Sequence, residues 1–324
     1  MNGINSSPIH IVFLDRETLP AETVLKPLSF PHRLTVYDRT APQEVATRIA
    51  TADYVITNKV PLRREQLDAA PSLKLIAIAA TGYDVIDVES CATRNIAIVN
   101  IRNYAVNTVP EHTFALILAL RRSILAYRQS VQAMRWQNAD QFCYFDYPIN
   151  DLARSTLGII GDGALGKMVG EVGKAFGMQV LFSAYKGTKG MGPLYTPFEE
   201  VLARSDVITL HAPLLPSTHH MISDTEFALM ERQPLIINTA RGGLIDEEAL
   251  SRALRSGRIA GAGFDVVTSE PPPHNHVFME LLELPNFILT PHIAWSSREA
   301  IQSLADQLIE NIELFNSGHP RHLI

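Results

Sequence analysis

The stretch Leu157-Gly-Ile-Ile-Gly-Asp-Gly-Ala-Leu-Gly166 constrains the fold of this chain more than any other. It places the spacing G-x-G-x-x-G directly after an apolar run typical of a buried strand and directly before a helical pattern. Gly161 would permit a tight turn, Gly163 would let a pyrophosphate approach the backbone, and Gly166 would let the helix pack closely on its strand. Free N–H groups at the helix start would then hold phosphates. The stretch therefore predicts a strand–turn–helix unit that binds a dinucleotide.

Apolar runs alternate with helical patterns along most of the chain, first from residue 9 and again from residue 157. Such alternation is typical of βαβ units, so each series predicts one α/β domain with a doubly wound parallel sheet. Six strands in the second series match one dinucleotide-binding sheet. The expected strands are 9–14, 34–37, 54–57, 75–80 and 96–99 in the first series, and 157–160, 179–182, 207–210, 235–238, 259–264 and 287–289 in the second.

Helical patterns connect and follow the two series. Residues 107–127 carry an apolar pattern over about five turns, which predicts one long helix between two domains. A final amphipathic helix over residues 298–315 has no strand after it and is expected to return to the first domain. The expected helix ends are marked by the capping boxes Thr196/Glu199, Ser223/Glu226 and Ser296/Glu299 and by a C-terminal cap at Gly257.

The length of 324 residues exceeds what one core usually holds, and 46% hydrophobic residues can fill two domains of about 150 residues each. The predicted division assigns residues 105–295 to a dinucleotide-binding Rossmann domain. Residues 1–104 plus 296–324 are assigned to a substrate-binding lid domain with a flavodoxin-like sheet. Linkers are expected near residues 101–106 and 294–297.

Charge and cysteine content exclude several classes of protein. The net charge of −6 comes from acidic and basic residues mixed throughout, so no broad positive surface is offered to nucleic acid. The polar start, residues 1–10, lacks the features of a secretory signal, and no run approaches the ~18 apolar residues of a membrane span. Cys91 and Cys143 have no C-x-x-C spacing, are not expected to form a disulfide and fit a cytoplasmic protein.

Cofactor choice is read at the end of the strand after the glycine turn, where an acidic residue would bind the adenosine ribose of NADH. This chain has Ser183-Ala184-Tyr185-Lys186 there, with Lys189 close behind. No carboxylate would repel a 2′-phosphate, and the two lysines could attract one. We therefore predict that NADP(H) is preferred and that NAD(H) is possible. Two solvated loop lysines would give the same pattern.

Three stretches of the second series supply a cation, a carboxylate and an imidazole: TARGG with Arg241, SEPPP with Glu270 and PHIAW with His292. Reduction of a 2-keto acid places negative charge on the carbonyl oxygen, so it needs a proton donor and a positive group. His292 fits the first task and Arg241 the second, because a guanidinium fork can also hold a carboxylate. Glu270 would accept a hydrogen bond from the imidazole and raise the pKa of the histidine. With a dinucleotide, this set predicts hydride transfer.

Each of these three side chains has an ordinary structural explanation when taken alone. Arg241 could bind a helix end or a surface carboxylate, Glu270 could be an exposed loop acid, and His292 could be structural. However, Arg241 and His292 each follow an expected strand, at the carboxyl edge where open parallel sheets bind ligands. This shared placement favours the catalytic interpretation.

Several short motifs run in a fixed order through nearly the whole chain. They are Thr57-Asn-Lys-Val-Pro61, Ala80-Thr-Gly-Tyr-Asp84, Thr108-Val-Pro-Glu-His-Thr113, Leu157 to Gly166, His211-Ala-Pro213, Asn238-Thr-Ala-Arg-Gly-Gly243, Gly263-Phe-Asp-Val266 and Pro291-His-Ile-Ala-Trp295. Together they resemble the D-isomer-specific 2-hydroxyacid dehydrogenase family, and most closely its hydroxypyruvate reductase or glycerate dehydrogenase branch. The resemblance implies that Arg241, Glu270 and His292 are the catalytic arginine, glutamate and histidine.

The resemblance also implies further binding residues. Besides the glycine turn and residues 183–186, those implied for the cofactor are Ala164, Leu165, His211, Pro213, Thr239, Ala240 and Asp265, the last at the nicotinamide carboxamide. Those implied for the substrate are Asn58, Lys59 and Val60 on the opposing wall of a cleft, Thr81 and Gly82 through their N–H groups, Arg241, His292 and Trp295. In one respect the chain departs from the family, because NADH-linked members usually carry an acid at the position of Ala184.

The substrate and the assembly follow from the same resemblance. An indole at Trp295 would narrow the pocket and favours hydroxypyruvate and glyoxylate, reduced to D-glycerate and glycolate, although a tryptophan packed in a hinge would look alike. The family implies a homodimer built on the nucleotide-binding domains, with residues 107–127 contributing. A helix buried within one subunit would show the same apolar pattern.

Other functions remain open at this point. A D-lactate- or phosphoglycerate-type dehydrogenase would share the fold and the motifs, and a nucleotide-sensing binding protein would share the fold. No metal is expected, because neither the adjacent His219 and His220 nor the pair His274 and His276 has the spacing of a zinc site.

Overall fold

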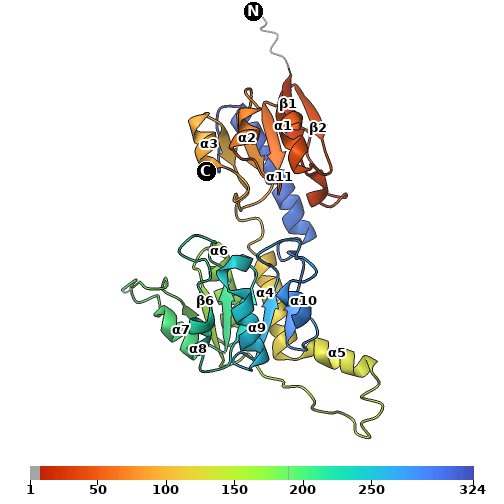
Figure 1. Ribbon diagram of the computed structural model, residues 1–324, viewed down its shortest axis with the longest axis vertical. Helices are drawn as coiled ribbons and strands as arrows, with labels where there is room; N and C mark the ends of the chain where they lie inside the picture. The colour runs from red at the N-terminus through yellow and green to blue at the C-terminus, as the bar shows by residue number, and fades with distance from the viewer. Residues whose placement is uncertain (1–7, 189) are drawn as a thin grey trace, which may run out of the picture. The chain divides into compact units, whose positions relative to one another are not determined.

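The structure is a computed structural model that describes residues 8–188 and 190–324, so Lys189 and the first part of the polar start lie outside the described residues. The chain divides into two compact units (Figure 1). Unit 1 consists of Met1–Tyr104 and Ser297–Ile324, and unit 2 consists of Ala105–Ser296. Each unit is built around one parallel sheet.

The sheet of unit 1 has the strand order β2-β1-β3-β4-β5, which is the flavodoxin-like order. Alternate residues of a strand point to opposite faces, so Val55 packs in the core under the helices α1 to α3, whereas Tyr54 contacts Phe315 of α11. The elements are β1 (Ile9–Phe13), η1 (Arg16–Thr18), β2 (His32–Val36), η2 (Pro42–Glu44), α1 (Val45–Ile49), β3 (Tyr54–Thr57), α2 (Arg64–Asp68), β4 (Leu75–Ile78), α3 (Val88–Thr93), β5 (Ala97–Val99) and α11 (Arg298–Asn316).

The sheet of unit 2 has the parallel order β11-β10-β9-β8-β6-β7. On the outer side of β7, a single parallel bridge joins Ser183 to Thr196, where a Rossmann sheet has a further strand. The strands are β6 (Thr156–Ile160), β7 (Gln179–Phe182), β8 (Val207–Leu210), β9 (Leu235–Asn238), β10 (Gly261–Phe264) and β11 (Phe287–Leu289). The predicted fold class, two doubly wound parallel sheets of Rossmann and flavodoxin-like type, is confirmed.

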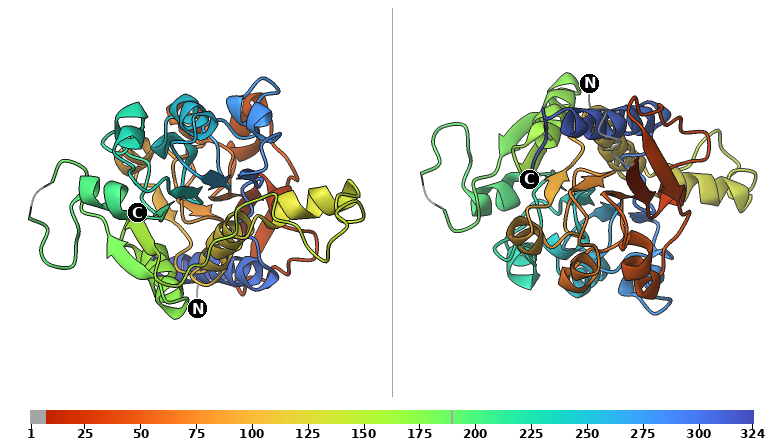
Figure 2. Two further views of the ribbon diagram at one scale, coloured as in Figure 1. Left: turned by 90° about the horizontal axis from the view of Figure 1, so that it is seen from below. Right: turned by 90° about the horizontal axis from the view of Figure 1, so that it is seen from above.

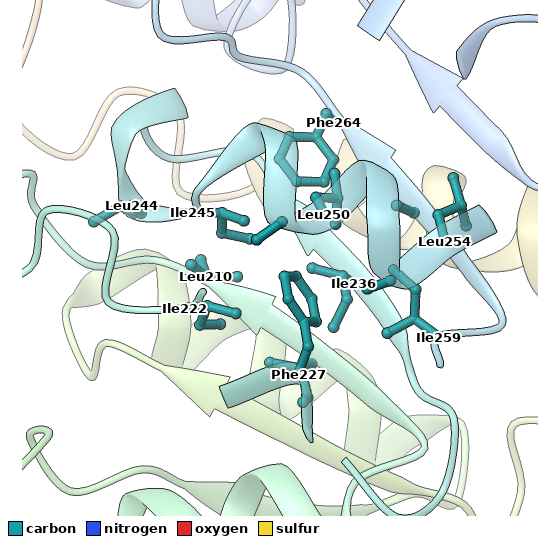
Figure 3. Packing of buried hydrophobic residues seen from close by; sticks show 14 of the residues in the cluster. Leu210, Ile222, Phe227, Ile236, Leu244, Ile245, Leu250, Leu254, Ile259 and Phe264 are labelled. Atoms are coloured by element: carbon teal, nitrogen blue, oxygen red, sulfur yellow. The ribbon is translucent and has the colours of Figure 1, made fainter. Parts of the chain in front are cut away.

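Helices cover both faces of this second sheet. On one face, Ile237 of β9 packs in a cluster with Phe114 of α4 (Thr108–Arg121) and Val169 of α6 (Ala164–Ala175). On the other face, Ile236 packs with Phe227 and Leu250 (Figure 3). The helices of that second face are α7 (Phe198–Arg204), α8 (Asp224–Ala228), α9 (Glu247–Arg255) and α10 (Val277–Leu281). Because helices cover both faces, the central strands are buried along their whole length, and their neighbouring apolar residues point to opposite clusters.

The predicted single helix over residues 107–127 is wrong. α4 ends at Arg121 and a second helix, α5, runs over Ile124–Gln132. Ser123 adopts a left-handed conformation with φ of 50°, which interrupts the helix, and its hydroxyl donates to the carbonyl of Pro148. The apolar pattern continued across the break because both helices happen to keep apolar residues near it.

Two of the predicted capping boxes are also wrong. α7 has Pro197 at its N-cap, because the backbone of Thr196 already pairs with residues next to β7. α11 is capped one residue later than expected, by the hydroxyl of Ser297, whereas Ser296 donates to the carbonyl of Ile293. The box of Ser223 with Glu226 and the left-handed glycine after α9 are confirmed.

Candidate active site

The glycine turn joins β6 to α6 and has one glycine at each place where atoms must come close. Gly161 has a φ of 107°, and a Cβ added there would lie 2.5 Å from the carbonyl carbon of His211, which follows β8. A Cβ at Gly166 would clash with the carbonyl oxygen of Gly161. At Gly163, by contrast, no heavy atom of the described residues lies within 4 Å of such a Cβ. The turn is therefore tight on the protein side and open on the side where a phosphate would approach.

This turn lies where the strand order of the sheet reverses. β6 is flanked by β7 and β8, and a crevice forms beyond the carboxyl ends at such a switch point. Burial lowers the pKa of His211 to about 4, so its imidazole is neutral at physiological pH. Its Nε2 lies 3.0 Å from Oγ1 of Thr209. The N–H groups at the start of α6, with Ala164 and Leu165 as its first residues, contribute positive potential at this edge of the sheet.

At the end of β7, Ser183 and Ala184 are buried and Tyr185 is exposed. Nζ of Lys186 lies 2.8 Å from Oε1 of Glu226 and donates to the carbonyl of Met221 at 3.0 Å. Burial acts to raise the pKa of Glu226, but hydrogen bonds from Lys186 and Ser223 leave it below its ordinary value. The ammonium of Lys186 therefore already has an ionised partner, a pairing that no pattern around either residue marks.

One further contact near the end of β7 involves the glycine turn itself. The hydroxyl of Tyr195 donates to Oδ2 of Asp162 at 2.5 Å. This bond ties the residue between Gly161 and Gly163 to the segment that follows β7. Sequence reasoning missed both residues, because the spacing of the glycine motif leaves Asp162 unspecified.

The predicted acid and base come together at the other end of the sheet edge. Nδ1 of His292 lies 2.6 Å from Oε2 of Glu270, and the N–H of Val267 donates to Oε1 of the same carboxylate at 3.2 Å. His292 follows β11 and Glu270 follows β10, and these strands are neighbours. Within the described residues, no hydrogen bond to Nε2 of His292 is present, so this nitrogen is the one available to a ligand.

The segment carrying Arg241 packs against the segment carrying Glu270. A Cβ at Gly242 would clash with the backbone of Val267 and Thr268, so the two segments touch without room for a side chain. Nη1 of Arg241 donates to the carbonyl of Ala240 at 2.8 Å. Arg241 follows β9, which lies beside β10. The three predicted catalytic residues thus lie at the ends of three adjacent strands.

Asp265 occupies a supporting position beneath His292. Its side chain is only 1% exposed, and its carboxylate accepts hydrogen bonds from the hydroxyl of Thr290 and from the N–H groups of Ile293 and Ala294. These bonds fix the turn in which His292 has a φ of 54°. The expected contact of Asp265 with the nicotinamide carboxamide stays a prediction. Trp295 donates from Nε1 to the carbonyl of His292 at 3.0 Å, so its indole lies beside this turn.

In unit 1, the predicted substrate residues follow β3 and β4. The N–H groups of Asn58, Lys59 and Val60 all donate to the carboxylate of Asp15, which is 4% exposed. This carboxylate therefore uses the donors of that segment, a role that sequence reasoning missed because Asp15 lies 43 residues before Asn58.

The turn after β4 offers donors of a different kind. The hydroxyl of Thr81 donates to the carbonyl of Ile101 at 2.7 Å, and Nδ2 of Asn100 donates to the carbonyl of Thr81 at 2.8 Å. These bonds fix the turn. No hydrogen bond from the backbone N–H of Thr81 or Gly82 to another described residue is present. The expected contact of these two N–H groups with a substrate carboxylate stays a prediction.

Comparison with known proteins places this geometry in a family. A family model described as "D-isomer specific 2-hydroxyacid dehydrogenase, NAD binding domain" matches residues 114–294. The chain belongs to the D-isomer-specific 2-hydroxyacid dehydrogenase family. It is 50% identical over 315 residues to the glycerate dehydrogenase of Methylorubrum extorquens. The aligned region covers 97% of this chain and 98% of that protein.

Two other proteins extend the comparison. The hydroxypyruvate reductase of Blautia hydrogenotrophica is 36% identical over 321 residues, covering 97% of this chain and 99% of that protein. A solved D-lactate dehydrogenase from Aquifex aeolicus, complexed with NAD and lactic acid, is 30% identical with a TM-score of 0.80, covering 95% of this chain and 96% of that chain. The matched NAD-binding region includes the glycine turn, Arg241, Glu270 and His292. The enzyme is a 2-hydroxyacid dehydrogenase with a nicotinamide dinucleotide cofactor.

Other features bear on the expectations about metals, membranes and cysteines. Among the described residues, no group of three His, Cys, Asp or Glu side chains could hold a metal ion. Across residues 8–188 and 190–324, no helix is both long and apolar enough to cross a bilayer. Cys91 and Cys143 are both free thiols, as expected, and burial raises the pKa of Cys91 to about 11.

Two matched variants test this account of the glycine turn. Gly163→Ala is expected to fold normally, because its methyl group meets open space, and to weaken dinucleotide affinity about tenfold, or about 1.4 kcal/mol. Gly166→Ala is expected to lower the melting temperature, because α6 must move off Gly161. Thermal denaturation and titration of NAD(P)H fluorescence measure the two effects. An unchanged affinity for Gly163→Ala, or an unchanged melting temperature for Gly166→Ala, would contradict this account of the turn.

Proposed function

We propose that this enzyme reduces small 2-keto acids, namely hydroxypyruvate and glyoxylate, to D-glycerate and glycolate, with His292 as the general acid. The observation that carries the proposal is the 2.6 Å contact of His292 with Glu270 at the same sheet edge as the glycine turn. The names of the glycerate dehydrogenase and hydroxypyruvate reductase relatives support the substrate class. The indole of Trp295 beside the His292 turn is consistent with a narrow pocket.

The roles of the acid and base follow from their contacts. A nicotinamide dinucleotide held by the glycine turn would supply the hydride for the keto carbon. His292 donates a proton from Nε2 to the keto oxygen, so that the carbonyl becomes a hydroxyl. Glu270 holds Nδ1–H and stabilises the imidazolium before transfer. In the reverse direction the neutral imidazole accepts the same proton, and Glu270 then stabilises the charge that forms.

Several hydrogen-bond donors are assigned to substrate binding. Arg241 binds the substrate carboxylate through its guanidinium and polarises the keto group. In unit 1, Thr81 and Gly82 offer two N–H groups to a substrate carboxylate, and unit 1 acts as the substrate-binding domain. Asn58, Lys59 and Val60 form part of the wall that Asp15 fixes. Unit 2 acts as the dinucleotide-binding domain, with further cofactor contacts from Ala164, Leu165, Tyr185, His211, Pro213, Thr239, Ala240 and Asp265.

The preferred cofactor is NADP(H), with NAD(H) accepted. The support is the buried Ala184 at the end of β7, where a carboxylate would otherwise bind the ribose diol and repel a 2′-phosphate. Lys186 contributes less to this argument than expected, because Glu226 already neutralises it. Lys186 follows β7 and is bound to Glu226, so a 2′-phosphate would have to share its ammonium with the Glu226 carboxylate.

The assembly is a homodimer that buries α5 and the segment 133–150. These residues extend away from the sheet of unit 2 (Figure 2). Their large apolar side chains are exposed, including Phe142 at 87% and Phe145 at 85%. The apolar residues of α4, by contrast, pack in the core of unit 2, so the pattern that suggested an interface for residues 107–127 is explained by burial. A second copy of the chain is proposed to cover these exposed apolar side chains.

Removing the imidazole tests the reaction. His292→Ala is expected to lower kcat/KM for hydroxypyruvate reduction by about 10²- to 10⁴-fold, because the proton donor is lost. Wild-type reduction should fall as the pH rises and the imidazolium loses its proton. The exposed His274, changed to Ala, is the control and should retain full activity. Absorbance of NAD(P)H measures the rates, and activity of His292→Ala within about threefold of wild type would reject the role.

A substitution at the end of β7 tests the cofactor preference. Wild-type kcat/KM is expected to be higher with NADPH than with NADH, and Ala184→Asp is expected to reverse the order, because a carboxylate there repels the 2′-phosphate. Thr188→Asp adds the same charge to the exposed loop and should change the ratio by no more than about twofold, because solvent screens it. A wild-type kcat/KM about tenfold higher with NADH would overturn the preference.

Light scattering tests the assembly. The wild-type mass is expected to be twice the 35.9 kDa of one chain. The double variant Phe142→Ser with Phe145→Ser should shift the mass toward that of one chain, because the proposed interface loses two large apolar side chains. Leu194→Ser removes a similarly exposed side chain outside this segment and should leave the dimer intact. A wild-type monomer at every concentration would contradict the proposal.

A further inference from the structure

A second glutamate–histidine pair, Glu247 with His276, contacts the loop that carries Glu270. Glu247 is the first residue of α9, and its side chain is 11% exposed, while that of His276 is 10% exposed. Oε1 of Glu247 accepts from the N–H of Thr268 at 2.7 Å, and Oε2 lies 3.0 Å from Nε2 of His276. Both oxygens of one nearly buried carboxylate are therefore in use, in a pair that the reaction described above does not require.

The protonation of this pair is fixed by a backbone donor. The N–H of Phe278 donates to Nδ1 of His276 at 3.2 Å, and a backbone N–H can only donate. Nδ1 must therefore be the bare nitrogen of the ring, and Nε2 carries the proton that His276 gives to Glu247. In this pair, the Nε2–H of the imidazole therefore donates to Oε2 of Glu247. An amide in place of the carboxylate has one accepting oxygen instead of two, so it cannot keep both contacts in the present geometry.

The position of the two partners explains what the pair does. Thr268 and His276 lie at the two ends of one loop, residues 268–276, and Glu270 lies inside it. Glu247 therefore closes this loop at both ends with one side chain, an arrangement that we call the Glu247 clasp. Next to it, Gly242 packs directly on the backbone of Val267 and Thr268. The segment 241–247 thus supports the loop of Glu270 at two points.

We propose that Glu247 is a positioning residue for the acid–base pair, an inference that rests on the proposed function. By closing the loop, the Glu247 clasp keeps the carboxylate of Glu270 at 2.6 Å from Nδ1 of His292. When the clasp opens, Glu270 stabilises the imidazolium of His292 less well. Proton donation then weakens, while the glycine turn, three strands away in the sheet, keeps its geometry.

Other charged groups near His292 are left unchanged by the clasp. Asp265 from β10 bonds the N–H groups that follow His292. His112 from α4 has its Nε2 3.6 Å from Oδ1 of Asp265. Arg241 follows β9, and its Nη1 donates to the carbonyl of Ala240. An altered titration of His292 after a change at Glu247 would therefore be transmitted through Glu270.

The test uses Glu247→Gln, which keeps the size of the side chain but leaves one acceptor for two donors. Its control is Glu248→Gln, which removes the same charge from the next, exposed residue of α9. Expected for Glu247→Gln are a kcat about tenfold lower, an unchanged KM for NAD(P)H and loss of activity at a lower pH than in wild type. Glu248→Gln should match wild type in all three. Overlapping pH profiles and equal kcat for the two variants would overturn the proposal.

A second measurement does not depend on turnover. The His292 imidazole is titrated by NMR in the wild type and in Glu247→Gln, Glu248→Gln and Glu270→Gln. The midpoint is expected to move to lower pH in Glu270→Gln and, by a smaller amount, in Glu247→Gln, with no movement in Glu248→Gln. If the midpoint moves but no 2-keto acid is reduced by the wild type, the clasp stands and the proposed function fails. If the keto acids are reduced and the midpoint does not move, the clasp fails and the proposed function stands.

Discussion

The candidate site depends on the parallel alignment of six strands in unit 2. Because every strand points the same way, every loop after a strand emerges at the same edge of the sheet. Read across the sheet, the ends of β7, β6, β8, β9, β10 and β11 carry the 183–186 segment, the glycine turn, His211, Arg241, Glu270 and His292 in that order. Residues that are far apart in sequence thus form one line, with phosphate donors near one end and the acid–base pair at the other.

The charged groups along this line are bound to protein partners before any ligand arrives. Lys186 pairs with Glu226, and His292 contacts Glu270. Separately, within unit 1, Asp15 accepts three N–H groups. His211, at the switch point, is neutral because burial lowers its pKa. Groups fixed in this way need little rearrangement when a substrate develops charge, which is the basis of electrostatic preorganisation. The Glu247 clasp applies the same principle to the loop that carries Glu270, because it holds that loop through Thr268 and His276.

The strands, the glycine turn and the meeting of Glu270 with His292 could be predicted from the sequence, because each depends on a local pattern or on the shared edge of a parallel sheet. The break at Ser123 could not, because apolar residues on both sides hide a single left-handed residue. Thr196 failed as a cap because its backbone pairs beside β7. Local capping signals cannot reveal such competition from tertiary structure.

Contacts between distant polar residues were the other part that the sequence could not supply. Glu226 lies 40 residues after Lys186, and nothing in the pattern around either residue marks the pairing. The same holds for Asp15 with Asn58 and for Glu247 with His276. Burial of one partner forces each of these pairs to form, because an unpaired buried carboxylate is costly. Burial, however, is known only once the fold is known.

The most direct measurement of the central claim is a crystal structure of the enzyme with its oxidised dinucleotide and oxamate, a non-reducible mimic of a 2-keto acid. The account predicts that C4 of the nicotinamide lies about 3–3.5 Å from the amide carbon of oxamate, which takes the place of the keto carbon. It also predicts that Nε2 of His292 is within hydrogen-bonding distance of the amide oxygen of oxamate, with Glu270 still on Nδ1. A nicotinamide bound more than about 10 Å from His292, with oxamate held elsewhere, would place the chemistry outside this site and contradict the account.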